Sequence, residues 1–362
     1  MRKSNSIREL LGIDVPIIQA PMGGVGTQDL AVAVSDAGGL GSMAFAGATQ
    51  DSLRQSLQSV AQATSKSINF NFFAHERPVV SQADDDRWID ALTPYFNEFE
   101  IDIPEQLSNN GIEIFGADLC DVLLEHKPKI VSFHFGLPAD EFISQLKNAG
   151  ILIMSSATTV REAIYLETKG CDAIIAQGLE AGGHRGMFLS KDVSSQVGTM
   201  ALVPQVVDAV GVPVIAAGGI ADGRGISAAM ALGASAVQMG TAFLRCTETA
   251  LNNVYAQALD EAGPDDTALT NVISGRPTRI RSNRLVKDLG PLSADAPVFP
   301  RGFGVNSALR SVAEAKNSDE FSAHYCGQAV ALGKPGSASK LVEEMWSDAI
   351  NRSSQIRDAL IS

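Results

Sequence analysis

Cysteine and histidine are both scarce in this chain of 362 residues, which has four of the first and five of the second. The cysteines are widely scattered and form no C-x-x-C pair; they are Cys120, Cys171, Cys246 and Cys326. Neither a zinc site nor a disulfide framework is indicated, and we expect reduced, buried thiols in a cytosolic protein. Because no H-E-x-x-H spacing occurs, we predict no metal site. A G-x-S-x-G elbow for a nucleophilic serine is also missing.

Positive charge is in short supply as well, since 28 Lys and Arg residues face 41 Asp and Glu residues for a net charge of −13. This balance argues against a general nucleic-acid or anionic-membrane binder. No apolar stretch is long enough to span a bilayer, and no apolar signal segment follows the charged residues 1–5. We therefore expect a cytoplasmic protein, and any cofactor phosphate would have to bind mainly through backbone N–H groups and helix dipoles.

Apolar residues are plentiful at 45% of the chain, and they gather in eight short runs that alternate with segments of helical period. The runs are Pro16–Ala20, Gly39–Met43, Ser67–Phe73, Lys129–Phe135, Ile151–Ser155, Ala173–Gln177, Val212–Ala217 and Ala236–Gly240. Eight such strands, most followed by a plausible helix, predict a parallel (β/α)8 TIM barrel of the α/β class. A doubly wound sheet is less favoured, because the cluster Gly23–Asp29 lacks the third glycine of the dinucleotide fingerprint.

Two regions do not follow the alternation of predicted strands and helices. The acidic stretch Ala74–Pro128 is predicted to elaborate the third strand–helix connection. After Arg245 the alternation stops, so we predict a barrel over residues 1–246, a smaller substrate or cap domain over residues 247–333, and C-terminal helices at 334–362 that pack back on the barrel. The basic run Arg276–Arg284 is interpreted as a surface or interdomain element.

The run Gln177–Gly186 is the clearest candidate site. It contains four glycines and one histidine, His184, and it directly follows a predicted buried strand. Glycine lets backbone approach a flat or charged ligand closely, and histidine titrates near neutral pH. We interpret this loop as a ligand and proton-transfer site rather than an ordinary turn.

The last two predicted strands both end in glycine and lead toward a helix. In barrels of this kind the loops after strands seven and eight commonly bind phosphate. Exposed N–H groups there point at the anion, and glycine has no Cβ to block it. The alternative is a pair of tight turns without a ligand. The residues concerned are Gly218, Gly219, Gln238, Met239, Gly240 and Thr241.

Carboxamides stand at the ends of several predicted strands, among them Asn71, Gln177 and Gln238. An amide both donates and accepts, which suits a neutral heterocycle better than a metal; the alternative is that these amides satisfy buried backbone. Met22, after the first strand, offers a polarizable surface for an aromatic ring. His134 either lines the same pocket or is a satisfied buried histidine.

Five ordered motifs together resemble the nitronate monooxygenases, formerly called 2-nitropropane dioxygenases. They are Gln19–Gly23, Asn71–Phe73, Ala176–His184, Ala217–Ile220 and Gln238–Thr241, with shorter matches at Ser274–Pro277 and Gly327–Gln328. The forms Gly182–Gly186 and Val131–Gly136 are most similar to the bacterial class I enzymes. Aromatic and lysine residues of the second domain help to close the class I pocket, and they have no clear counterpart between Ala294 and Tyr325.

The resemblance implies an FMN-binding TIM barrel with a smaller second domain. Gly219, Gly240 and Thr241 would hold the FMN phosphate, with Gly218 and Met239 beside them in the same motifs. Asn71, Gln177 and Gln238 would bind the flavin, with Met22, Gly23 and Gly182 close to its ring. His184 matches the family's active-site histidine, and His134 would contact the substrate.

Such enzymes oxidise alkyl nitronates, for example propionate 3-nitronate, with O2 to a carbonyl compound and nitrite. Two alternatives remain open. One is an NAD(P)H-dependent flavin reductase of the same superfamily, acting on a quinone or an enoyl thioester; the other is a flavin-binding barrel without turnover. We expect a small-molecule substrate, a monomer or homodimer, and neither a nucleic-acid nor a membrane partner.

Overall fold

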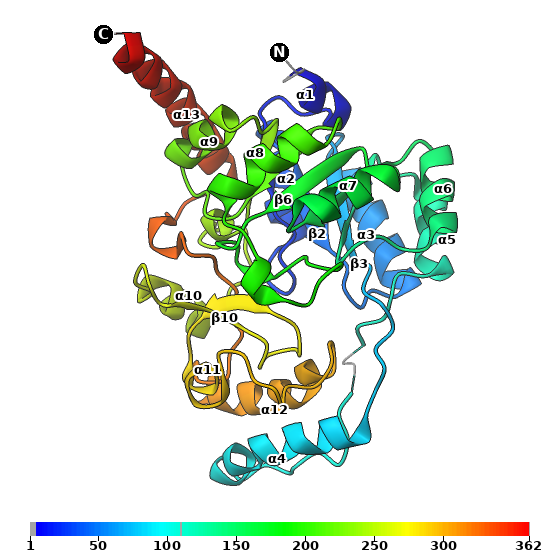
Figure 1. Ribbon diagram of the computed structural model, residues 1–362, viewed down its shortest axis with the longest axis vertical. Helices are drawn as coiled ribbons and strands as arrows, with labels where there is room; N and C mark the ends of the chain where they lie inside the picture. Colours follow the sequence, from blue (N-terminus) through cyan, green and yellow to red (C-terminus); the bar gives the residue numbers. More distant parts are fainter. Residues whose placement is uncertain (1–4, 109–110, 362) are drawn as a thin grey trace.

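Eight parallel strands form the central sheet of the computed structural model, which describes residues 5–108 and 111–361 (Figure 1). Their order is β1-β9-β8-β6-β5-β4-β3-β2, and a parallel bridge between Ile18 and Leu40 brings the two end strands together. The sheet therefore closes almost completely, and the predicted barrel is confirmed. The strands are β1 (Ile17–Gln19), β2 (Gly41–Ala44), β3 (Ile68–Phe73), β4 (Ile130–His134), β5 (Leu152–Ala157), β6 (Ala173–Gln177), β8 (Val214–Ala217) and β9 (Ala236–Met239).

The amino-terminal end of the barrel is closed by α1 (Asn5–Leu11). Ile7 and Leu11 of this helix are fully buried and belong to one apolar cluster with Ile130 and Ala173, the first residues of β4 and β6. Burial of an aliphatic side chain of this size contributes about 1.5–3 kcal/mol. Because side chains fill this end of the barrel, we expect the site at the carboxyl ends of the strands.

Seven helices cover the outside of the barrel, and α13 (Ala338–Ile361) packs against two of them, α2 and α9. Thr159 caps α7, because its Oγ1 accepts a hydrogen bond of 3.2 Å from the N–H of Glu162. The seven helices are α2 (Gln28–Asp36), α3 (Gln50–Ala63), α5 (Ala117–His126), α6 (Asp140–Asn148), α7 (Val160–Thr168), α8 (Thr199–Ala209) and α9 (Gly223–Ala231).

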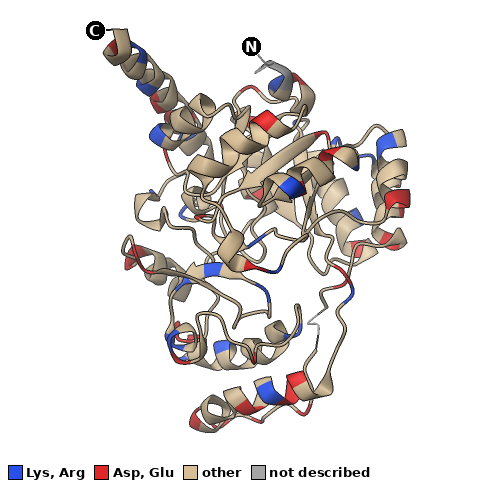
Figure 2. Cartoon of the chain, in the orientation of Figure 1, with Lys and Arg blue, Asp and Glu red and all other residues tan. Residues whose placement is uncertain are grey.

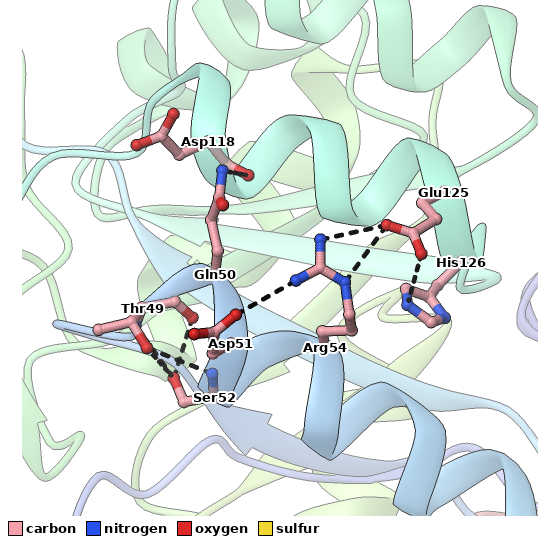
Figure 3. A network of polar contacts seen from close by, with 8 residues as sticks. All are labelled: Thr49, Gln50, Asp51, Ser52, Arg54, Asp118, Glu125 and His126. Atoms are coloured by element: carbon pink, nitrogen blue, oxygen red, sulfur yellow. Dashed lines mark hydrogen bonds and ion pairs between the residues drawn. The ribbon is translucent and has the colours of Figure 1, made fainter.

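Polar contacts tie α3 to α5 on the outside of the barrel (Figure 3). The guanidinium of Arg54 donates from Nη2 to Glu125 Oε2 at 3.2 Å, and Gln50 Nε2 donates to the carbonyl of Asp118 at 3.2 Å. His126 lies beside Glu125 in this network, away from the predicted site. Since such exposed pairs contribute about 0–1 kcal/mol each, they orient α5 more than they stabilise it.

A second hydrophobic cluster lies beyond the carboxyl ends of the barrel strands and contains α4 (Gln82–Glu98), α11 (Arg284–Leu289) and α12 (Gly302–Ala315) (Figure 1). Trp88 of α4 is fully buried there together with Leu309 of α12. The stretch Ala74–Pro128 thus sends α4 to the second cluster and returns with α5 to the barrel. Whether the domain limits fall at residues 246 and 333 stays a prediction.

A small antiparallel sheet connects the two bodies of the protein, which are the barrel and the second hydrophobic cluster. Its order is β10 (Thr267–Thr270), β11 (Thr278–Arg281) and β7 (Gly183–His184). The first two strands come from the region after the barrel, whereas β7 comes from the loop that follows β6. The backbone of this loop is therefore part of the second body.

Acidic and basic side chains are interspersed over the outer helices (Figure 2). Among the described residues, no helix is long and apolar enough to cross a membrane.

Candidate active site

The loop from Gln177 to Gly186 runs from the carboxyl end of β6 to the second cluster. Gln177 is the last residue of β6, and His184 is the last residue of β7, where it pairs with Thr278 of β11. Barrel enzymes hold their chemistry at this end of the strands. The loop therefore places His184 between the barrel and the second cluster.

Ser274 holds the imidazole of His184. Its buried Oγ lies 2.8 Å from His184 Nε2, and the other ring nitrogen, Nδ1, has no hydrogen-bond partner among the described residues. The hydroxyl proton has two acceptors within reach, His184 Nε2 and, at 3.4 Å, the carbonyl of Arg276. The 2.8 Å bond forms whether the hydroxyl donates to Nε2 or accepts from it, so this contact orients the ring in either neutral tautomer.

His184 is neutral at physiological pH. Burial, with smaller contributions from His134 and Arg276, lowers the pKa of His184 from 6.5 to about 3. A neutral imidazole can donate one hydrogen bond from Nδ1 to a ligand, but it brings no positive charge to the site.

Five aromatic rings surround His184, and we call them the aromatic wall. Their centroids lie between 5.6 and 6.2 Å from the imidazole centroid. One ring comes from β3, one follows β4, and the others come from the second cluster and the segment after it. The rings are Phe73, Phe135, Phe299, Phe303 and Tyr325. They enclose His184 in apolar surroundings, which is the physical cause of its low pKa.

Gln177 and His134 both bind the backbone of the same loop. Gln177 Nε2 donates to the carbonyl of His184 at 3.0 Å, and its Oε1 accepts from the N–H of Gly186 at 2.7 Å. His134 Nε2 lies 3.0 Å from the same carbonyl, so it must donate; its Nδ1 then accepts from Ser156 Oγ at 3.0 Å. Every polar atom of these two side chains has a protein partner, while the predicted roles toward flavin and substrate stay predictions.

Burial lowers the pKa of His134 to about 4, so this ring is also neutral. Arg185 lies in the predicted loop but was given no role there, and it completes the fixation of the loop. This arginine is fully buried, and it donates to the carbonyls of Gly178 at 2.5 Å and Gln177 at 2.8 Å and to Gln196 Oε1 at 3.1 Å. Its hydrogen-bonding capacity is largely used within the loop.

The glycines predicted to bind phosphate line the ends of β8 and β9. Gly218 and Gly219 have φ of +113° and +71°, conformations that other residues rarely adopt. A Cβ on Gly240 would lie 3.4 Å from the nearest atom, so its backbone is accessible to a ligand. Thr241 Oγ1 accepts from the N–H of Gly327 at 2.8 Å, which brings the chain after the second cluster to the same place.

Glu180 lies close to the glycines at the ends of β8 and β9, where an acidic group would repel a phosphate. Its side chain lies beside Gly219, but both carboxylate oxygens accept from the N–H of Thr199 at 2.9 Å. One oxygen also accepts from Thr199 Oγ1 at 2.8 Å. The carboxylate is therefore directed at the amino terminus of α8, whose dipole it offsets.

The residues present fit FMN. A Cβ on Gly23 or Gly183 would meet no atom within 4 Å, so these backbones border open space. Two buried amide oxygens, Gln238 Oε1 and Asn69 Oδ1, have no hydrogen-bond partner. Buried acceptors without a donor are costly, and the N–H of a flavin's pyrimidine ring is a donor of the required kind. Glycine-bordered space with orphaned acceptors suits a flat, polar-edged heterocycle.

The remaining predicted residues have varied surroundings. A Cβ on Gly182 would come within 2.5 Å of the backbone carbonyl carbon of Cys326, so glycine is needed there for packing alone. Asn71 Nδ2 donates to Ser132 Oγ at 2.8 Å, and Met239 is buried in the barrel's outer core. Met22 lies near Gly240. Their roles toward a cofactor stay predictions.

Among the site residues that were not predicted are Ser274, Arg276, Phe299 and Phe303. The short match at Ser274–Pro277 was the only sequence signal for the first two. The basic run was interpreted as a surface or interdomain element, yet Arg279 is buried and Arg276 lies over the ring of Phe135.

A nearly closed parallel barrel with its polar residues gathered at the carboxyl ends of the strands defines a barrel enzyme. Residues 4–348 match the sequence model of the family described as nitronate monooxygenase, and the chain belongs to that family. It is 42% identical to a nitronate monooxygenase of Paraburkholderia phytofirmans over 355 residues, covering 96% of both chains. It is 43% identical to one of Pseudomonas aeruginosa, covering 93% of this chain and 96% of the relative. The structure is similar to that of a nitroalkane oxidase from Streptomyces ansochromogenes, with a TM-score of 0.88, 35% identity and coverage of 98% and 99%.

Proposed function

We propose that this protein is an FMN-dependent nitronate monooxygenase. It oxidises alkyl nitronates, such as propionate 3-nitronate, with O2 to a carbonyl compound and nitrite. The observation that carries the proposal is a neutral His184 that is surrounded by the aromatic wall and whose Nδ1 has no hydrogen-bond partner among the described residues. A cytoplasmic location and a role in removing toxic nitro compounds are part of the same proposal, on the family resemblance.

Gly219, Gly240 and Thr241 would hold the phosphate of FMN, and Gln238 would bind the edge of its ring. Bound FMN supplies redox chemistry, taking electrons from the substrate and passing them to O2. The protein's task is then to bind the nitronate in the correct orientation and to exclude water.

His184 suits an anion that arrives already deprotonated. We assign to His184 the tautomer with the proton on Nδ1, in which the ring donates to a nitronate oxygen while Ser274 donates to Nε2. Removal of a proton from a neutral nitroalkane would instead need a bare lone pair at Nδ1. The aromatic wall lowers the local polarity, which strengthens the hydrogen bond to the anion.

The test compares two reactions of the purified, FMN-loaded protein. Addition of propionate 3-nitronate should give O2 uptake and nitrite release, whereas NADH should leave the flavin absorbance unchanged. Rapid bleaching by NADH with no reaction of the nitronate would contradict the proposal and favour the reductase alternative. Protein that cannot be loaded with FMN would overturn the cofactor assignment.

His184→Asn should keep the bound flavin and lose about 100-fold or more in kcat/KM, because the group that orients and polarises the substrate is removed. His126→Asn, at the barrel surface, is the matched control and should retain wild-type activity. A His184→Asn variant within about twofold of wild type would mean that this histidine is structural.

A further inference from the structure

Arg276 has no carboxylate partner, although it is mostly buried. Among the described residues its side chain makes one hydrogen bond, from Nη2 to the carbonyl of Met187, and its Nε is buried without a partner. No acidic side chain of the described chain forms an ion pair with it. By contrast, the buried Arg301 is paired with Asp85. Burial lowers the pKa of Arg276 to about 10, so it is still a cation at neutral pH.

Two carboxylates act on Arg276 only from a distance. Glu162 is buried, and its oxygens accept from the N–H and Oγ1 of Thr158 and from the N–H of Phe188 and Leu189. Glu76 is exposed to solvent. Buried charges are normally paired or fully hydrogen-bonded, and Arg276 is neither.

His75 presents a second unsatisfied group near the same rings. Its side chain is 6% exposed, and its Nδ1 is buried without a hydrogen-bond partner. The imidazole centroid lies 5.0 Å from that of Phe299, and the guanidinium carbon of Arg276 lies 5.9 Å from the same ring. Both groups also lie near Phe135, at 6.4 Å for His75 and 3.9 Å for Arg276.

We propose that Arg276 and His75 form a subsite for a carboxylate at the end of the substrate remote from the nitronate. The inference rests on the proposed function and deepens it. A carboxylate accepts several hydrogen bonds, and a guanidinium together with an imidazole N–H supplies charge and donors. The ring of Phe135 is near both groups, with its centroid 5.9 Å from that of His184 and 3.9 Å from the guanidinium carbon of Arg276. A short-chain nitronate can therefore present its reacting end to His184 and its carboxylate to Arg276.

Two substrates of equal length distinguish a role of Arg276 in carboxylate binding from a general role in activity. Propionate 3-nitronate carries the carboxylate, and butyl-1-nitronate carries an uncharged end. Arg276→Met should lower kcat/KM for propionate 3-nitronate about 10- to 100-fold, the effect of losing a charged hydrogen bond, and change that for butyl-1-nitronate less than about threefold. Arg276→Lys should give an intermediate kcat/KM for propionate 3-nitronate, since lysine keeps the charge but loses the bidentate geometry of the guanidinium. His75→Leu should show the same preference for the uncharged substrate to a smaller degree.

Lys287→Met is the matched control, because it removes an exposed positive charge from α11. It should leave both substrates unaffected, and FMN content should be equal in all variants. An equal loss for both substrates, or no loss for propionate 3-nitronate, would overturn the subsite.

Binding of 3-nitropropionate can be measured without turnover. Calorimetry should show that 3-nitropropionate binds wild-type protein about 10-fold or more tightly than Arg276→Met, while 1-nitrobutane binds both alike. If no nitronate is oxidised but this difference holds, the proposed function fails and the subsite stands. If nitronates are oxidised and the difference is missing, the subsite fails alone.

Discussion

At the scale of single residues, the side chain that acts on His184 is the hydroxyl of Ser274. It is fully buried, and within residues 5–108 and 111–361 it is the one group that forms a hydrogen bond with a ring nitrogen of His184. In the proposed tautomer Ser274 donates to Nε2, and the single imidazole proton lies on Nδ1. A serine that touches no substrate would thereby set which ring atom the substrate meets.

Ser274→Ala should lower kcat/KM for nitronates about fivefold, the equivalent of roughly 1 kcal/mol for one neutral hydrogen bond. Flavin content should not change, and the loss should appear mainly in kcat because the ring's orientation is what suffers. Ser155→Ala is the matched control: this serine is equally buried, but its Oγ donates to the carbonyls of Phe133 and Gly136. Equal losses of activity in both variants would show that Ser274 acts only through stability.

At the scale of elements, a buried ion pair connects α4 to the segment that carries part of the aromatic wall. Arg301 Nε lies 2.9 Å from both carboxylate oxygens of Asp85, whose side chain is 2% exposed. Arg301 directly precedes α12 and follows Phe299 by two residues. The excursion of the chain to α4 thus supports one ring that faces His184.

Asp85→Ala should lower the free energy of unfolding by about 3 kcal/mol or more, because it leaves the guanidinium of Arg301 buried without a counter-ion. Urea unfolding measures this loss. The double variant Asp85→Leu with Arg301→Met should recover much of the stability, since it removes both charges. Asp51→Ala breaks the exposed pair with Arg54 and should cost less than about 1 kcal/mol. Similar losses for the two single variants would contradict this account.

The barrel strands were predictable because both faces of each strand are buried, so that β6, for example, reads as a nearly unbroken apolar run. The histidine loop was predictable because its glycines and its histidine are adjacent in sequence. Phe299 and Phe303 were not, since they reach His184 only through the folding of the second cluster, more than a hundred residues away. The charge of Arg276 looked like a surface property, because sequence alone does not reveal that no acidic residue pairs with it.

At the scale of the whole molecule, four of the five histidines are held neutral. Burial lowers the pKa of His75, His134 and His324 to about 4 and that of His184 to about 3. In the unfolded chain these groups take up protons near pH 6.5, whereas in the folded chain they do so only near pH 3–4. Between these limits the unfolded state binds more protons and gains stability as the pH falls.

The free energy of unfolding should therefore decrease as the pH is lowered from about 7 to 5, by up to about 1.4 kcal/mol per pH unit for each histidine. Urea unfolding at a series of pH values measures the slope. His134→Gln should reduce that slope by up to one proton equivalent. A stability that stays flat over this range would show that these rings take up protons at the same pH in the folded and unfolded states.

The two-residue strand β7 has a further consequence. His184 belongs by its backbone to the small sheet beyond the barrel, while Gln177 and His134 bind the carbonyl of the same residue from the barrel side. If the two bodies separated to admit a substrate, hydrogen bonds of the reactive centre itself would have to break on one side or the other. Under the proposed function, such an opening and a correctly placed His184 would exclude each other, and the rate of exchange between the two states would limit turnover.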